Sequence, residues 1–128
     1  MTTHSHRSLV TLAAVLGLGL AAAAADAQTL RVRCDVFSDR SKASVDGEDL
    51  AAGQYSALLE SGDHSAQSPM QAAQNGEAQF DFDSDKGDVR HGATKIGRHF
   101  IVNDSVTGTL LDADGNVVAK KTRQCSVH

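Results

Sequence analysis

The densest group of chemically useful side chains lies in QFDFDSDKGDVRHG, residues 79–92. Four aspartates fall within eight positions, at Asp81, Asp83, Asp85 and Asp88. The first three are spaced i, i+2 and i+4, as in the opening half of a calcium loop, and calcium takes about six to eight hard oxygen ligands. The stretch therefore raises the hypothesis of a calcium site, or another metal site, built from these four carboxylates.

A simpler interpretation explains the same residues. An EF-hand loop needs glycine at its sixth position, where this chain has Lys86. In an extended strand, Phe80 and Phe82 would point to one face and Asp81 and Asp83 to the other. A slip of one residue would expose both rings and bury the carboxylates, so the register is well defined. We therefore predict a strand whose acidic face, Asp83 included, is exposed to solvent, with calcium binding as the alternative.

Histidines and basic residues form two further groups. Four histidines lie beyond residue 27, at His64, His91, His99 and His128. No H-x-H or H-x-x-x-H pair occurs among them, so the spacing favours exposed histidines over a transition-metal site. A basic group directly follows the aspartates and could bind an anionic partner or only balance the acids. Its members are Arg90, His91, Lys95, Arg98 and His99.

The sequence carries no motif of a known type of active site. It has no G-x-S-x-G and no H-E-x-x-H. A catalytic triad assembled from residues distant in the sequence stays open. We expect a protein that is not an enzyme and that needs no cofactor.

The first 27 residues have the organisation of a secretory signal peptide. A short polar start contains Arg7, an apolar run follows over residues 9–25, and Ala25-Asp26-Ala27 supplies a cleavage site of small residues. The predicted mature chain is residues 28–128, in the periplasm or secreted. No second apolar run is long enough to span a membrane.

Two cysteines fit such an exported domain. Cys34 and Cys125 lie near the two ends of the mature chain, and two cysteines in an oxidising compartment predict one disulfide. The chain-entropy model credits so long a loop with about 4.5 kcal/mol of stabilisation. We therefore predict a structural bridge that leaves no free thiol.

The net charge argues against nucleic acid as a partner. The chain has a formal net charge of −4 and no tryptophan. Nucleic-acid binders usually carry a basic stripe, and proteins that stack bases need more aromatic side chains.

Short alternating segments predict an all-β fold. Residues 30–37 alternate apolar and charged side chains, and residues 106–111, a turn at 112–116 and the segment from Val117 onward predict a hairpin. The basic KKTR at residues 120–123 predicts an exposed or edge position for the returning strand. Tyr55, after a Gly-containing turn, resembles the tyrosine corner of Greek-key sandwiches. We predict one small antiparallel β-sandwich of about seven strands, immunoglobulin-like or transthyretin-like.

These features predict a binding module that acts through its loops. Residues 61–76 and 84–98 are the long polar connections, the second with a short strand over residues 93–96 as an option. Long loops in compact domains are often functional. We expect them to contact an unknown protein or cell-envelope partner. A periplasmic calcium- or metal-binding protein that uses residues 81–88 is the alternative.

Overall fold

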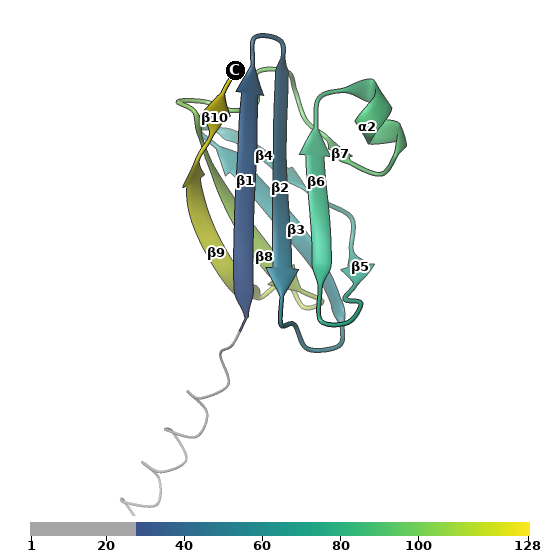
Figure 1. The fold of residues 1–128 in the computed structure, drawn as a ribbon. Helices are drawn as coiled ribbons and strands as arrows, with labels where there is room; N and C mark the ends of the chain where they lie inside the picture. Colours follow the sequence, from purple (N-terminus) through teal and green to yellow (C-terminus); the bar gives the residue numbers. More distant parts are fainter. Residues whose placement is uncertain (1–27) are drawn as a thin grey trace, which may run out of the picture.

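The computed structural model describes residues 28–128, which form two β-sheets packed face to face (Figure 1). A short helix, α2 (Lys86–Arg90), lies between β6 and β7. Within residues 28–128, no helix is long and apolar enough to cross a membrane. The predicted signal peptide, residues 1–27, lies outside the described residues. The strands in chain order are β1 (Thr29–Phe37), β2 (Arg40–Glu48), β3 (Gln54–Ser61), β4 (His64–Gln67), β5 (Gln71–Ala72), β6 (Ala78–Asp83), β7 (Thr94–Lys95), β8 (Ser105–Asp112), β9 (Val117–Gln124) and β10 (Ser126–Val127).

The chain crosses repeatedly between the two sheets. The first sheet has the strand order β10-β1-β2-β6-β7, and the second has the order β4-β3-β8-β9, with β5 also paired to β3. The hairpins β1–β2, β3–β4 and β8–β9 are antiparallel. The predicted class is thereby confirmed at the level of a mostly β, two-sheet structure.

Alternate side chains of both sheets fill the space between them. Phe80 and Phe82 of β6 are 3% and 0% exposed, and they lie opposite Val45 and Ala43 of β2. The predicted register of β6 is therefore confirmed for its apolar face. Leu110 of β8, also fully buried, belongs to the same core.

The ends of the domain are joined as predicted. Cys34 of β1 and Cys125 form a disulfide across a sequence separation of 91 residues. Beyond Cys125, β10 runs parallel to β1, with Val127 in register with Val36. The chain thus leaves the second sheet at the end of β9 and finishes as the outer strand of the first (Figure 1).

Three local predictions are also confirmed. The hydroxyl of Tyr55 donates a hydrogen bond to the carbonyl of Ala51 at 2.8 Å, as in a tyrosine corner. In the β8–β9 turn, Oδ1 of Asp112 accepts from the backbone N–H groups of Asp114 and Asn116, each at 2.9 Å. The returning strand β9 is the outer strand of its sheet, and its basic residues are exposed.

The two predicted loops contain more regular structure than expected. Residues 61–76 include β4 and β5, which both pair with β3, and residues 84–98 include α2 and β7. Polar, small side chains concealed these elements, because none of them carries the apolar alternation of a half-buried strand. The prediction of a long irregular loop is therefore wrong for residues 61–76. Within residues 84–98, the short strand considered over residues 93–96 is confirmed as β7, whereas α2 was not predicted.

Candidate functional site

The acidic stretch is divided between a strand and a helix, and the prediction for Asp83 is wrong. Asp81 is exposed on the outer face of β6, as predicted, but Asp83 on the same face is only 1% exposed. Arg40 of β2 donates two hydrogen bonds to it, from Nε to Oδ1 at 2.9 Å and from Nη2 to Oδ2 at 2.7 Å. Strand alternation fixes the face of a side chain but not what covers that face.

The remaining two aspartates act at the helix. Asp85 is the N-cap of α2 and accepts hydrogen bonds from the backbone N–H groups of Gly87 and Asp88. The Oδ2 atom of Asp88 accepts a hydrogen bond from Nη2 of Arg40 at 2.5 Å. Arg40 therefore ties α2 to the end of β6. We name the group Arg40, Asp83 and Asp88 the Arg40 corner.

Charge interactions shift the pKa values of both carboxylates in the Arg40 corner. Burial alone would raise the pKa of Asp83, but the hydrogen bonds from Arg40 and from the backbone of Asp85 hold it at about 2. Hydrogen bonding to Asp83 raises the pKa of Asp88, and Arg40 offsets part of that increase. The positive charge of Arg40 is thus already neutralised within the protein.

The four predicted metal ligands do not converge on one point. Asp83 and Asp88 bind Arg40, Asp85 caps α2, and Asp81 points to solvent. Among residues 28–128, no group of three or more His, Cys, Asp or Glu side chains is placed to hold a metal ion.

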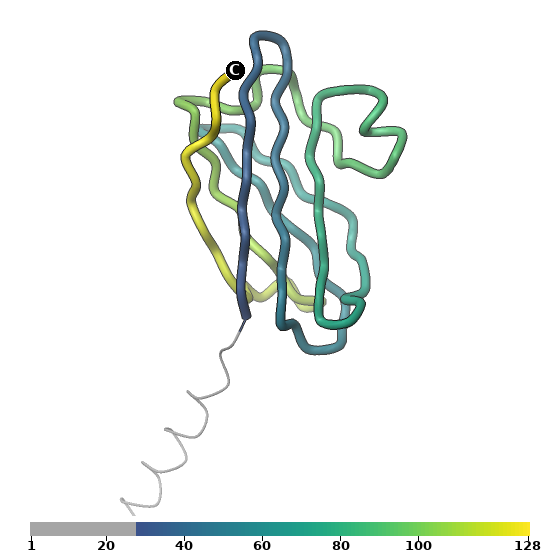
Figure 2. The backbone as a smooth tube through the Cα atoms, viewed as in Figure 1, coloured from purple at the N-terminus to yellow at the C-terminus, as the bar shows by residue number. Residues whose placement is uncertain are grey.

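A different part of the molecule brings the two predicted contact segments together. They meet at the end of the sandwich that carries the β1–β2 and β3–β4 turns, where the chain between β7 and β8 crosses from one sheet to the other (Figure 2). An open hollow of about 600 Å³ lies there. We name it the end hollow; it is lined by Asp63, His64, Ser65, Gly97, Arg98, His99 and Phe100.

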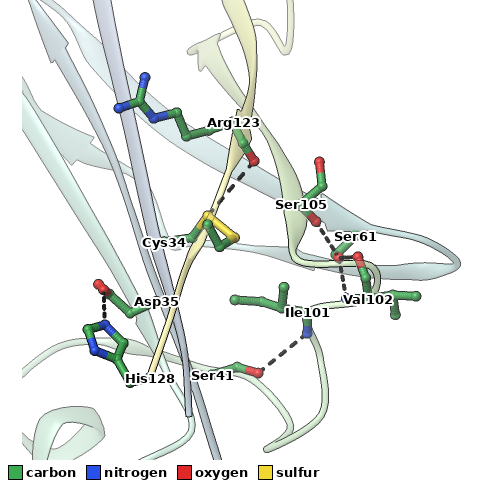
Figure 3. The surroundings of a disulfide bond; sticks show 10 residues. Cys34, Asp35, Ser41, Ser61, Ile101, Val102, Ser105, Arg123 and His128 are labelled. Carbon is green, nitrogen blue, oxygen red and sulfur yellow. Dashed lines mark hydrogen bonds and ion pairs between the residues drawn. A yellow bond between two sulfur atoms is a disulfide. The ribbon is translucent and has the colours of Figure 1, made fainter.

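Two buried serines fix the segment that forms one side of the end hollow. Ser41 of β2 donates from Oγ to the carbonyl of Arg98 at 2.8 Å and accepts from the N–H of Ile101 at 3.4 Å. Ser61 of β3 accepts from the N–H of Val102 at 2.7 Å (Figure 3). The two serines are 1% and 4% exposed. The backbone of the hollow is therefore held in place by the sandwich itself.

His64 connects the two sides of the end hollow. Its Nδ1 atom lies 2.7 Å from the carbonyl oxygen of Phe100, and because a carbonyl can only accept, Nδ1 carries the proton. The His64 ring also packs against the Phe100 ring, with 5.6 Å between centroids. In the neutral ring, Nε2 is then left as an acceptor. The N–H of Phe100 donates a hydrogen bond to the carbonyl of Gly97 at 3.1 Å. This bond closes the turn over residues 97–100, which lies on the side of the end hollow that the two serines hold in place.

The cationic side chains that line the end hollow are not paired with carboxylates of the described domain. Arg98 and His99 are exposed, and neither forms an ion pair within residues 28–128. Asp63 is the one acidic residue that lines the hollow. A cationic rim beside the exposed ring of His64, with the buried Phe100 packed against that ring, is an arrangement that can take an anionic group with an apolar body.

The other histidines and basic residues lie elsewhere. Arg90 and His91 are at the C-terminal end of α2, and Lys95 is in β7. At the C-terminus, the ring of His128 stacks on Phe37 at 4.6 Å, and its Nε2 lies 2.9 Å from Oδ1 of Asp35 (Figure 3). The predicted basic group is thus split, and only Arg98 and His99 reach the hollow.

Sequence analysis missed the two serines, although a signal for them exists. Ser41 has the same strand parity as the buried Ala43 and Val45, and Ser61 has the same parity as Leu59. A serine at an inward position near the end of a strand must find a hydrogen-bond partner, which favours a loop that folds over it.

The comparisons with protein-family models, with curated proteins and with solved structures found no match for this chain.

Proposed function

We propose that this protein is an exported binding module and that the end hollow is its contact site. The observation that carries the proposal is the meeting of the residue 63–65 hairpin with the residue 97–100 turn around one hollow. The backbone there is fixed, whereas the side chains of Arg98 and His99 have no ion-pair partner within residues 28–128. Prearranged backbone reduces the entropic cost of binding, and unpaired cations leave charge available for a ligand.

The chemistry of the hollow favours an anionic ligand with an apolar body. Arg98 offers a guanidinium group, which can bind a carboxylate through two parallel hydrogen bonds. The exposed ring of His64, which packs on the buried Phe100, offers aromatic surface beside it. A carboxylate-bearing side chain or terminus of a protein, or an anionic cell-envelope component, has this combination.

The strand topology supports the immunoglobulin-like alternative over the transthyretin-like one. The adjacency β1-β2-β6 matches strands A, B and E of an immunoglobulin domain, and β3-β8-β9 matches strands C, F and G. In such sandwiches the loops gather at the two ends, and one end is often used for recognition. The end hollow occupies such an end.

The proposed location is the periplasm or the exterior of the cell. An intramolecular disulfide fits an oxidising compartment, and the signal-like residues 1–27 would direct the chain there. The proposal includes no catalytic step. Calcium binding at Asp81–Asp88 stays an untested alternative, and the ion pairs of Asp83 and Asp88 with Arg40 give it no support.

The test uses small ligands that have the proposed chemistry. Affinity for benzoate and for its neutral analogue benzamide is measured by ligand-observed NMR on the secreted protein. We expect millimolar binding of benzoate, at least tenfold stronger than that of benzamide. The variant Arg98→Ala should weaken benzoate binding at least tenfold, and the matched control Arg90→Ala, which removes an exposed arginine from α2, should not. Equal binding of both ligands, or an undiminished affinity in Arg98→Ala, would reject the end hollow as an anion site.

A further inference from the structure

The outer edge of β9, like the cationic side chains of the end hollow, has no bonding partner within residues 28–128. β9 (Val117–Gln124) is eight residues long and, within residues 28–128, pairs only with β8. Figure 1 shows it as the outermost strand on the left of the view. No strand is hydrogen-bonded to the other side of β9 within residues 28–128, so its backbone N–H and C=O groups that point away from β8 are unpaired there. β1 packs close to β9 at the end where Cys34 is bonded to Cys125.

The strands at the other sheet ends are shorter than β9, but they leave edges of their neighbours unpaired. β10 pairs with β1 only at Asp35 and Val36, and β7 pairs with β6 only at Phe82 and Asp83. The first sheet ends in β10 and β7, which have two residues each. The far edge of the second sheet is divided between β4, with four residues, and β5, with two. Natural sheets commonly protect their edges by shortening them. Among the strands at the sheet ends of the described domain, β9 is the longest. It also differs from β1, whose Arg31 and Arg33 are paired with Glu48 and Asp46.

β9 is also the place where unpaired positive charge gathers. Lys120, Lys121 and Arg123 are exposed, and none of them forms an ion pair within residues 28–128. No carboxylate faces them across the ladder, because their partners on β8 are Thr109, Gly108 and Val106. This concentration of positive charge lies in a chain whose formal net charge is −4.

The regular part of the edge coincides with the charged part. The pairing of β8 with β9 shifts register between Leu110 and Leu111, opposite the start of β9. From Ala119 to Gln124 the ladder is regular. A bulge disturbs strand addition where it occurs, so the half of β9 that can accept a strand is the half that carries Lys120, Lys121 and Arg123.

We propose that the edge of β9, over residues 119–124, binds an extended acidic segment of a partner protein by strand addition. Main-chain hydrogen bonds would supply affinity. Lys120 lies on one face of β9, and Lys121 and Arg123 lie on the other, so carboxylates on either face of the added strand would meet a cation and supply selectivity. A second copy of this chain is excluded as the occupant by the same charges, because pairing β9 with β9 would oppose lysine and arginine to one another. The proposal is independent of the end hollow.

The test separates strand addition from simple charge attraction. The first probe is an acetylated, amidated octapeptide of alternating threonine and glutamate, and the second is the same peptide N-methylated at every residue. N-methylation removes the N–H donors along both edges of the peptide and leaves its charge unchanged. Affinity and binding site are measured from the backbone amide NMR shifts of the secreted protein.

We expect the first peptide to shift the amides of residues 119–124, and the N-methylated peptide to bind at least tenfold more weakly. Reversal of two charges, with Lys120→Glu and Lys121→Glu together, should weaken binding at least tenfold. Because the N-methylated peptide is tested on the wild type, the result does not depend on the folding of that variant. Equal affinity of the two peptides, shifts confined to other residues, no shifts at millimolar peptide, or dimerisation of the protein alone through β9 would each overturn the proposal.

Discussion

The Arg40 corner and the end hollow use the same kinds of side chain in opposite ways. In the corner, Arg40 bonds to Asp83 and Asp88, and Asp83 is buried with its hydrogen bonds made. In the hollow, Arg98 and His99 are exposed and have no ion-pair partner within residues 28–128. The sequence shows only a run of acids followed by a run of bases, and it gives no sign of this division.

The difference shows that burial and pairing decide whether a charged side chain stabilises the fold or is available to bind a ligand. A buried charge must be paired, because the desolvation cost of an unpaired one is several kcal/mol, so the corner contributes to folding. An exposed charge on a fixed backbone contributes little to stability and remains available to a ligand. The two regions should therefore respond differently to mutation: changes in the corner should lower stability, and changes in the hollow should alter binding.

The largest effect should come from Asp83→Asn. The substitution removes the buried charge that pairs with Arg40. We expect a loss of about 2–4 kcal/mol in the free energy of unfolding, since the amide cannot accept both of the charge-assisted hydrogen bonds that Arg40 donates to Asp83. Urea unfolding measures the change. The matched control is Asp81→Asn, two residues away on the same strand face but exposed, with an expected change below about 0.5 kcal/mol. Equal effects of the two variants would contradict the assigned role of the corner.

The next largest effect is the dependence of stability on pH. The pKa of Asp83 is about 2 in the folded protein and about 3.9 in an unfolded chain, so its contribution is present above pH 4 and is lost as the pH falls toward 2. The raised pKa of Asp88 acts in the opposite direction and offsets part of this loss. Asp83 alone would account for about 2 kcal/mol between pH 5 and pH 2, so with the opposing contribution of Asp88 the wild type should lose less than about 2 kcal/mol more than Asp83→Asn. If the free energies of unfolding of the two proteins changed in parallel with pH, protonation of Asp83 would not be coupled to unfolding.

A smaller effect, of opposite sign, is expected for a buried polar group that lacks a partner. Thr109 is 3% exposed, and its Oγ1 atom makes no hydrogen bond to the rest of the described structure. Thr109→Val should therefore raise the free energy of unfolding by about 1 kcal/mol. Thr107→Val is the control, because the hydroxyl of Thr107 is bonded to that of Thr122 at 2.8 Å. A loss of stability in Thr109→Val would mean that its hydroxyl has a partner in solution.

The smallest effect on stability is expected in the hollow. Arg98 forms no ion pair within residues 28–128, and Ser41 holds its backbone rather than its side chain. Arg98→Ala should therefore change the free energy of unfolding by less than about 0.5 kcal/mol. Thermal melting of the variant beside the wild type checks this. A loss as large as that of Asp83→Asn would place Arg98 among the structural charges.

Local patterns predicted much of the fold. Alternation located β1 and the apolar face of β6, the Asp-Gly turn located the β8–β9 hairpin, and the cysteine positions gave the disulfide. The polar strands β4 and β5 were missed because nothing in their composition differs from a loop.

The candidate site was less predictable, because it depends on which strands are neighbours. Asp83 is buried because β2 pairs with β6, which brings Arg40 beside it, and no local pattern specifies that pairing. The end hollow likewise requires His64 and Phe100 to meet across 36 residues. The only sequence signal for a loop bound over that end is that Ser41 and Ser61 occupy strand positions whose side chains face the core.

The most direct test is a backbone amide shift map of the purified protein titrated with benzoate. The central claim is that the exposed charges of the end hollow bind a ligand, whereas those of the Arg40 corner serve the fold. The largest shifts should fall on residues 63–65 and 97–100, with little change at residues 81–88. Shifts centred on residues 81–88, or no shift in the hollow at saturating benzoate, would contradict the account.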